Sequence, residues 1–167
     1  MEYYVSKRDF KVHSELKDFI PCDFELAECI ASLNERGYET VACCAGHYNP
    51  GFYLYQNVKI DELDEYKGDS HVIITEVRED GFDMWSERLA SHIYVLFNKM
   101  YSFENLPEGF TLEDFEATSG TERCILECDV NYYDENGKMR KMKDVYEELD
   151  YRQKKLTAWA KSLPKNK

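Results

Sequence analysis

Apolar residues recur at the three- and four-residue spacing of an amphipathic helix from about residue 24 to residue 36. Asp23 stands where an N-cap residue would, and Gly37 follows as a C-terminal stop. Four residues would form the buried face: Leu26, Cys29, Ile30 and Leu33. The pattern therefore predicts a helix near the N-terminus that packs on a core.

A longer helix is predicted from about residue 141 to residue 162, after the turn signal "DENGK" at 134–138. Pro164 would end it. Its apolar positions recur at helical spacing and comprise Met142, Val145, Tyr146, Leu149, Leu156, Trp159, Ala160 and Leu163. A helix with such a face would dock on the rest of the chain.

The segments between the helices are typical of strands, with short runs rich in aromatic and β-branched residues. Strands are predicted at 38–43, 52–58, 71–77, 91–97 and 123–130. The acidic segment 61–70 is interpreted as a connection with one helical turn, and 105–120 as a loop with a short helix. We therefore expect an α+β fold: a mixed, mostly antiparallel sheet of about five strands, with the N-terminal helix and the long C-terminal helix packed on it.

Composition narrows the class of protein. With 167 residues, 43% of them hydrophobic, the chain suits one compact folded domain over residues 1–167. The longest apolar runs are too short to cross a membrane, and the first residues lack the order of a signal peptide, so a cytoplasmic location is expected. Six cysteines in such a protein are expected to be buried, reactive or metal-bound rather than disulfide-bonded.

The net charge of −12 is unevenly distributed. Residues 1–137 carry 29 acidic and 11 basic side chains, a net charge of −18, whereas residues 138–167 carry 4 acidic and 10 basic, a net charge of +6. An acidic surface of this kind repels nucleic acid and attracts basic proteins that bind nucleic acid. A purely solubilising surface is the alternative.

The segment "ETVACCAGHYNPG" at 39–51 carries the strongest chemical signal. Cys44 and His47 have the spacing of two zinc ligands on one tight turn, and Gly46 would ease that turn. Cys22, before the first helix, is the expected third ligand, and Cys43 or His13 would complete a closed tetrahedral shell. Cys29, Cys124 and Cys128 are expected in the core.

Two other interpretations of this segment remain open. Cys43 and Cys44 could be small buried hydrophobes beside an ordinary turn histidine, or one thiol could be a nucleophile paired with His47. The sequence has no complete nucleotide-binding, hydrolase, deaminase or metalloprotease motif. A binding protein is therefore favoured over an enzyme.

The segment "IASLNERGYETVACCAGH" resembles the pattern LN-x-(K/R)-G-Y-x-T-x-x-C-C-x-G-H, found in small proteins of Firmicutes and their phages. "IYVLF" and "LPEGF" are similar to further blocks of that group, and the resemblance covers about half of the chain. It implies a phage or mobile-element setting. A fainter resemblance links "CCAGH" to the "SCSGR" turn of wybutosine-synthesising tRNA methyltransferases, from which it departs at the final arginine.

Small acidic phage proteins often inhibit host defence, and the chain resembles the zinc-containing anti-CRISPR proteins directed at type II nucleases. The resemblance implies an acidic zinc protein that binds a CRISPR-associated nuclease and blocks loading of its nucleic acid. The carboxylates expected to contact the partner are Asp61, Glu62, Asp64, Glu65, Glu113, Asp114 and Glu116, with Tyr66 and Phe115 as aromatic anchors. The alternative is a metal-dependent enzyme acting on nucleotides or RNA, which requires an open metal position and a pocket.

Overall fold

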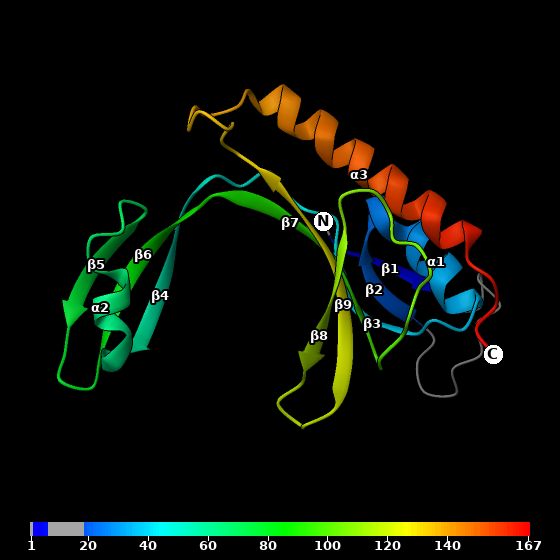
Figure 1. Ribbon diagram of the computed structural model, residues 1–167, viewed down its shortest axis with the longest axis horizontal. Coiled ribbons are helices and arrows are strands. Elements are labelled where there is room, and N and C mark those ends of the chain that lie inside the picture. The colour runs from blue at the N-terminus through cyan, green and yellow to red at the C-terminus, as the bar shows by residue number, and fades with distance from the viewer. Residues whose placement is uncertain (1, 7–18) are drawn as a thin grey trace.

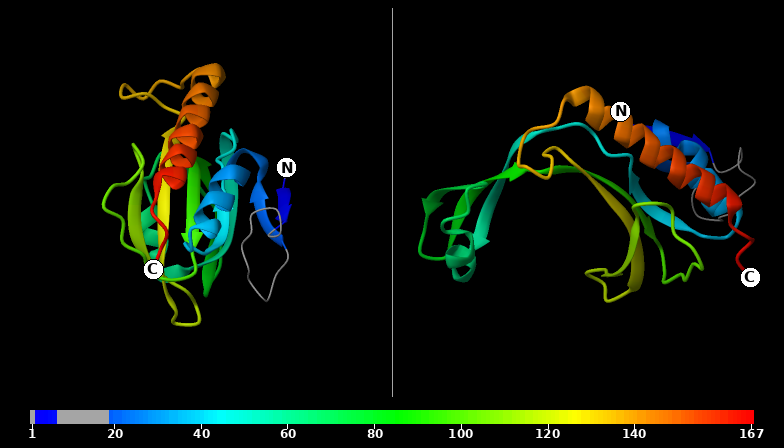
Figure 2. Two further views of the ribbon diagram at one scale, coloured as in Figure 1. Left: turned by 90° about the vertical axis from the view of Figure 1, so that its right-hand side faces the viewer. Right: turned by 45° about the horizontal axis from the view of Figure 1, so that its top comes forward.

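The computed structural model describes residues 2–6 and 19–167. The described residues form an arch with two legs of unequal size (Figures 1 and 2). The larger leg, here called the body, holds both termini and the two longest helices. The smaller leg, here called the arm, comprises residues 51–88.

A four-stranded sheet forms the centre of the body, and all its strand pairs are antiparallel. Its strands, in spatial order, are β3 (Thr40–Cys44), β7 (Ala90–Phe97), β9 (Glu122–Asn131) and β8 (Thr111–Glu116). Side chains alternate between the two faces of a strand. In β7, residues Ser91, Ile93, Val95 and Phe97 are buried, while His92 and Tyr94 are on the opposite face.

Helices cover the outer face of this sheet. The short 3-10 turn η1 (Phe24–Leu26) leads into α1 (Ala27–Glu35), which packs against α3 (Met142–Ser162). Figure 2 shows both helices on the convex side of the arch. A two-stranded sheet of β1 (Glu2–Ser6) and β2 (Phe19–Asp23) lies beside α1.

The arm is a second antiparallel sheet with the order β4 (Gly51–Lys59), β6 (Gly81–Arg88) and β5 (Val72–Val77). The turn η2 (Ile60–Glu62) and the single-turn helix α2 (Leu63–Tyr66) connect β4 to β5. Tyr66 of α2 packs near the Phe82 ring of β6. One residue, Leu89, separates β6 from β7, so the chain passes almost without interruption from the arm into the body.

The α+β class and both helices are confirmed. The strands differ from the expectation of one sheet, because the described residues form nine strands in three separate sheets. The segment 111–116, expected to be part of a loop, is strand β8, and strand β6 was not among the predicted strands. None of the helices in the described ranges combines the length and apolar character needed to cross a bilayer.

Candidate metal site

Residues 45–50 form the loop that follows β3, and Gly46 determines how closely it approaches the body. Gly46 has φ of +78°, a conformation that side-chain-bearing residues rarely adopt. A Cβ atom at this position would lie 2.9 Å from both Ile93 Cγ1 and Leu149 Cδ2. Glycine is therefore required both by the turn and by the packing of the loop on β7 and α3.

Hydrogen bonds from three elements hold this loop. The carbonyl of His47 accepts from Ser91 Oγ at 2.6 Å and from the Tyr132 hydroxyl at 3.1 Å. Gln153 of α3 donates from Nε2 to the Ala45 carbonyl at 2.8 Å. The loop is thus fixed at His47 by β7 and by the residue after β9, and at Ala45 by the C-terminal helix.

The alternation of β3 directs its two cysteines to opposite faces of the sheet. Cys43 is paired with Val95 and packs against the core, whereas Cys44 is paired with Tyr94 on the concave face. On the neighbouring strand β2, Cys22 belongs to the core, and Asp23 is the next residue. The cysteines that are adjacent in sequence therefore lie in different environments.

Asp23, Cys44 and His47 come together at this point. Their potential ligand atoms, a carboxylate oxygen, Sγ and a ring nitrogen, all lie within 4.8 Å of one another. His47 Nε2 is 3.1 Å from Asp23 Oδ2. The Asp23 side chain is 12% exposed and that of His47 is 52% exposed, so the group lies at the surface with its carboxylate inside. These three side chains could hold a metal ion.

The role of Asp23 differs from the sequence expectation. Asp23 is the N-cap residue of η1, but its side chain makes no capping hydrogen bond. Its Oδ2 atom instead accepts from the Ala45 backbone N–H at 2.7 Å. A hydrogen bond of this kind orients a carboxylate ligand in the way that outer partners do in metal sites.

Burial and nearby charge change the acidity of the thiols. Burial, followed by the Asp23 carboxylate, raises the pKa of Cys44, so the thiolate forms less readily without a metal. The Cys22 and Cys43 side chains are hydrogen-bonded to each other. This bond lowers the pKa of Cys22 and, together with burial, raises that of Cys43. Cys22 and Cys43 therefore form a pair of their own.

Of the predicted ligands, the structure brings Cys44 and His47 together and adds Asp23, which the sequence analysis treated as a helix cap. Cys22 and Cys43 are not members of the group found among the described residues. His13 lies outside the described residues. The three cysteines expected in the core are there, because Cys29 and Cys124 are fully buried and Cys128 is 6% exposed.

The acidic residues expected at a partner surface lie on both legs of the arch. Asp61, Glu62, Asp64 and Glu65 lie on η2 and α2 of the arm, and Glu113, Asp114 and Glu116 lie on β8 of the body. Glu62 is half-buried and the other six are exposed. Of the two expected aromatic anchors, Phe115 is 40% exposed, but Tyr66 is half-buried against Phe82 and is not a free anchor.

A pocket of about 330 Å³ adjoins the metal group on the concave side of the arch. Cys44, His47, His92 and Tyr94 contribute to its wall from the body, and β4 and β6 contribute from the arm. Sequence reasoning missed this pocket, because its two walls belong to separate sheets.

Comparison of the chain with protein-family models, with curated proteins and with solved structures gives no match.

Proposed function

We propose that this chain is an acidic zinc-binding protein whose arm docks on a basic, nucleic-acid-handling protein and competes with that protein's nucleic acid. A host defence nuclease of the CRISPR-associated type is the partner that the sequence analysis favours. The observation that carries the proposal is the arm itself, which projects from the body and combines net negative charge with exposed apolar side chains. The metal site belongs to the body and fixes the loop beside which the arm begins.

Zinc suits the donor atoms of the metal group. A thiolate, an imidazole and a carboxylate are all ligands that zinc accepts. An ion bonded at about 2.0–2.3 Å to each donor would separate the donors by roughly 3.3–3.8 Å. The separations of up to 4.8 Å among Asp23, Cys44 and His47 are close to that range, so a small inward movement would complete the site.

The outer face of the arm carries a row of apolar side chains. Leu54 of β4 and Ile73 of β5 are both paired in register with Trp85 of the central strand β6. Ile73 is 52% exposed and Trp85 is 39% exposed, and Phe52 extends the row on β4. Tryptophan and neighbouring aliphatic groups are typical anchors of protein interfaces.

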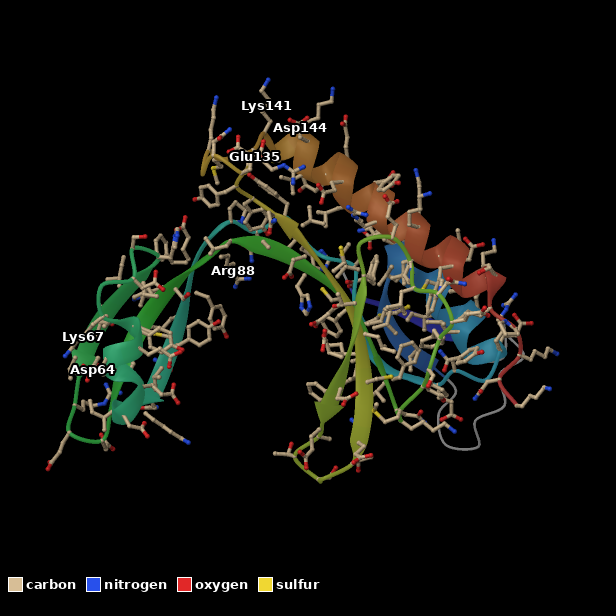
Figure 3. The ribbon with its side chains drawn as sticks, in the orientation of Figure 1. Asp64, Lys67, Arg88, Glu135, Lys141 and Asp144 are labelled. Atoms are coloured by element: carbon tan, nitrogen blue, oxygen red, sulfur yellow. The ribbon has the colours of Figure 1, made fainter. Side chains whose placement is uncertain are left out.

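Charge identifies the kind of partner. Residues 51–88 contain ten acidic and four basic side chains, a net charge of −6. Asp64 of α2 and Lys67, the residue that follows α2, are labelled in Figure 3 and form an ion pair. A strongly basic surface would associate with such an arm faster than a neutral surface would, and the association rate would fall as the salt concentration rises.

A guide-loading assay with a type II RNA-guided nuclease tests the proposal. Wild-type protein, added before the guide RNA, should reduce RNA loading, and the effect should weaken between low and high salt. Trp85→Ala should remove most of the inhibition, because Trp85 is the centre of the apolar row. Reversing two arm charges, Asp64→Lys with Glu65→Lys, should slow association.

A matched pair of charge reversals, Glu135→Lys with Glu147→Lys, serves as the control. Both residues are exposed and lie outside the arm, in the turn before α3 and on α3. The control should inhibit as the wild type does. Equal loss of inhibition in the control and arm variants would show that only the net charge of the protein matters. Guide RNA loading that is unchanged by wild-type protein would contradict the proposal for the nucleases tested.

A metal-dependent enzyme acting on nucleotides or RNA is the second candidate, and one observation favours it. The metal group has three members among the described residues, and its half-exposed histidine lies at a pocket. Catalytic zinc sites typically have three protein ligands and one open position, whereas structural sites are closed. Turnover of a nucleotide or RNA by zinc-loaded protein, without inhibition of any nuclease, would establish this candidate over the first.

A further inference from the structure

The pocket beside the metal group is lined by four tyrosines from three parts of the chain. Tyr53 and Tyr55 come from β4 of the arm, Tyr94 from β7, and Tyr132 from the residue that follows β9. Tyr53 and Tyr55 are about half exposed, and their rings meet edge to face with centroids 5.0 Å apart. Aromatic side chains of this kind provide a surface on which a planar ring can stack.

Arg88 adds a positive charge to the same pocket. It lies at the bend between the arm and the body, on the concave side (Figure 3). Its guanidinium carbon is 5.0 Å from the centre of the Tyr53 ring. Although the chain carries a net charge of −12, Arg88 forms no ion pair with any carboxylate in the described part of the chain. An arginine of this kind is suited to bind a phosphate or carboxylate.

Two carboxylates of this region are engaged by other groups. Glu87, which also lines the pocket, accepts hydrogen bonds from the Tyr133 hydroxyl and from His71. Glu127 of β9 is 3.0 Å from His92 Nε2. These contacts leave the Arg88 guanidinium available to a ligand.

The metal group on the body wall would complement Arg88. A divalent ion bound by the Asp23 carboxylate and the Cys44 thiolate would form a site with no net charge, since His47 binds as neutral imidazole. Without the ion, the Asp23 carboxylate would repel an anion. Metal loading would therefore change this wall from repelling an anionic group to accepting one.

We propose that the pocket binds a nucleoside monophosphate, with the phosphate between Arg88 and the metal group and the base against the exposed rings of Tyr53 and Tyr55. This ligand site rests on the metal site of the proposed function, but it is independent of docking by the arm's outer face. The volume of about 330 Å³ lies at the lower end of the roughly 300–1,000 Å³ typical of ligand sites, which suits one nucleotide.

Titration of zinc-loaded protein with adenosine 5′-monophosphate, followed by calorimetry, tests the site. The nucleotide should bind saturably with one site per chain, and both inorganic phosphate and adenosine should bind at least tenfold more weakly. Arg88→Gln should weaken nucleotide binding at least tenfold, because it removes the guanidinium group that would bind the phosphate. Tyr55→Ala should weaken it several-fold through loss of stacking.

Two controls separate this proposal from the others. Lys67→Gln removes an equal charge from the exposed residue that follows α2, outside the pocket, and should bind the nucleotide as wild type does. Trp85→Ala should also retain nucleotide binding while losing inhibition of the nuclease. Zinc content is measured on each sample, so that failure of the metal site is recognised independently.

Three results would overturn the nucleotide site. The first is no saturable binding by protein that carries one zinc per chain. The second is equal affinity in Arg88→Gln and Lys67→Gln. The third is binding of inorganic phosphate as tight as that of the nucleotide, which would show that the ring contributes nothing.

Discussion

The body and the arm are built from the same kind of antiparallel strand, yet they bury very different amounts of apolar surface. The buried apolar cluster of the described residues lies entirely in the body and includes Phe97, Leu126, Leu156 and Trp159. In the arm, Phe82 and Met84 are the buried apolar side chains among the described residues, whereas Trp85, Ile73 and Phe52 are exposed. Stability therefore resides mainly in the body, and the arm has apolar surface available for a partner.

The two tryptophans provide the largest test of this difference. Trp159 of α3 is 9% exposed, donates from its indole nitrogen to the Asn105 carbonyl at 2.7 Å, and packs edge to face on Phe103. Trp159→Ala should lower the free energy of unfolding by about 3–5 kcal/mol. Trp85→Ala in the arm should lower it by less than about 1 kcal/mol. Equal losses in chemical denaturation would show that the arm is as important to global stability as the body.

A pair of glycines provides a test of intermediate size. Gly46 and Gly68 both have positive φ, +78° and +84°, but only Gly46 has neighbours that a Cβ would meet, Ile93 and Leu149. Gly68→Ala should therefore lower the free energy of unfolding by about 1 kcal/mol, through backbone strain alone. Gly46→Ala should lower the free energy of unfolding by roughly 2–4 kcal/mol, because backbone strain and overpacking act together. Equal melting of the two variants would contradict the close packing of the 45–50 loop.

Acid should destabilise the arm at a higher pH than the body, and we expect this effect to be smaller than those of the tryptophan and glycine substitutions. Arg78 and the Asn57 backbone N–H lower the pKa of Asp83, and hydrogen bonds from Tyr133 and His71 lower that of Glu87. A carboxylate whose pKa is lower in the folded state stabilises the fold above its unfolded pKa of about 4, and this contribution is lost as pH falls through the folded-state value.

Hydrogen exchange at several pH values measures this effect. Amides of β5 and β6 should lose protection below about pH 4, before those of β7 and β9. Arg78→Gln should make the arm less sensitive to acid, because Asp83 loses its main ionic partner. Simultaneous loss of protection in both legs, in wild type and variant alike, would show that the two carboxylates do not stabilise the arm locally.

The sequence predicted the helices best, because each has an amphipathic pattern that a single element can satisfy. Strand β8 was missed because Glu113, Asp114 and Glu116 are poor strand formers, and its pairing with β9 is a tertiary effect. Strand β6 was not predicted, although the buried side chains of Phe82 and Met84 alternate with polar and exposed residues. In each case the neighbouring strand determines the structure.

The metal group shows the same limit at the level of single side chains. Cys44 and His47 could be predicted from local spacing, but Asp23 could not, because its distance from them depends on how β2 lies beside β3. A parity argument could have found it. If Cys22 meets Cys43 on the core side, the next residue of each strand, Asp23 and Cys44, is directed to the other side.

Native mass spectrometry of four proteins tests the central claim that Asp23, Cys44 and His47 form the metal site. Wild-type protein and Cys43→Ser, purified without chelator, should each carry one zinc per chain, because Cys43 is paired with Cys22 and lies outside the group. Cys44→Ser and Asp23→Asn should lose the metal while remaining folded. Loss of zinc in Cys43→Ser with retention in Asp23→Asn, or less than about a tenth of a zinc per wild-type chain, would contradict this assignment.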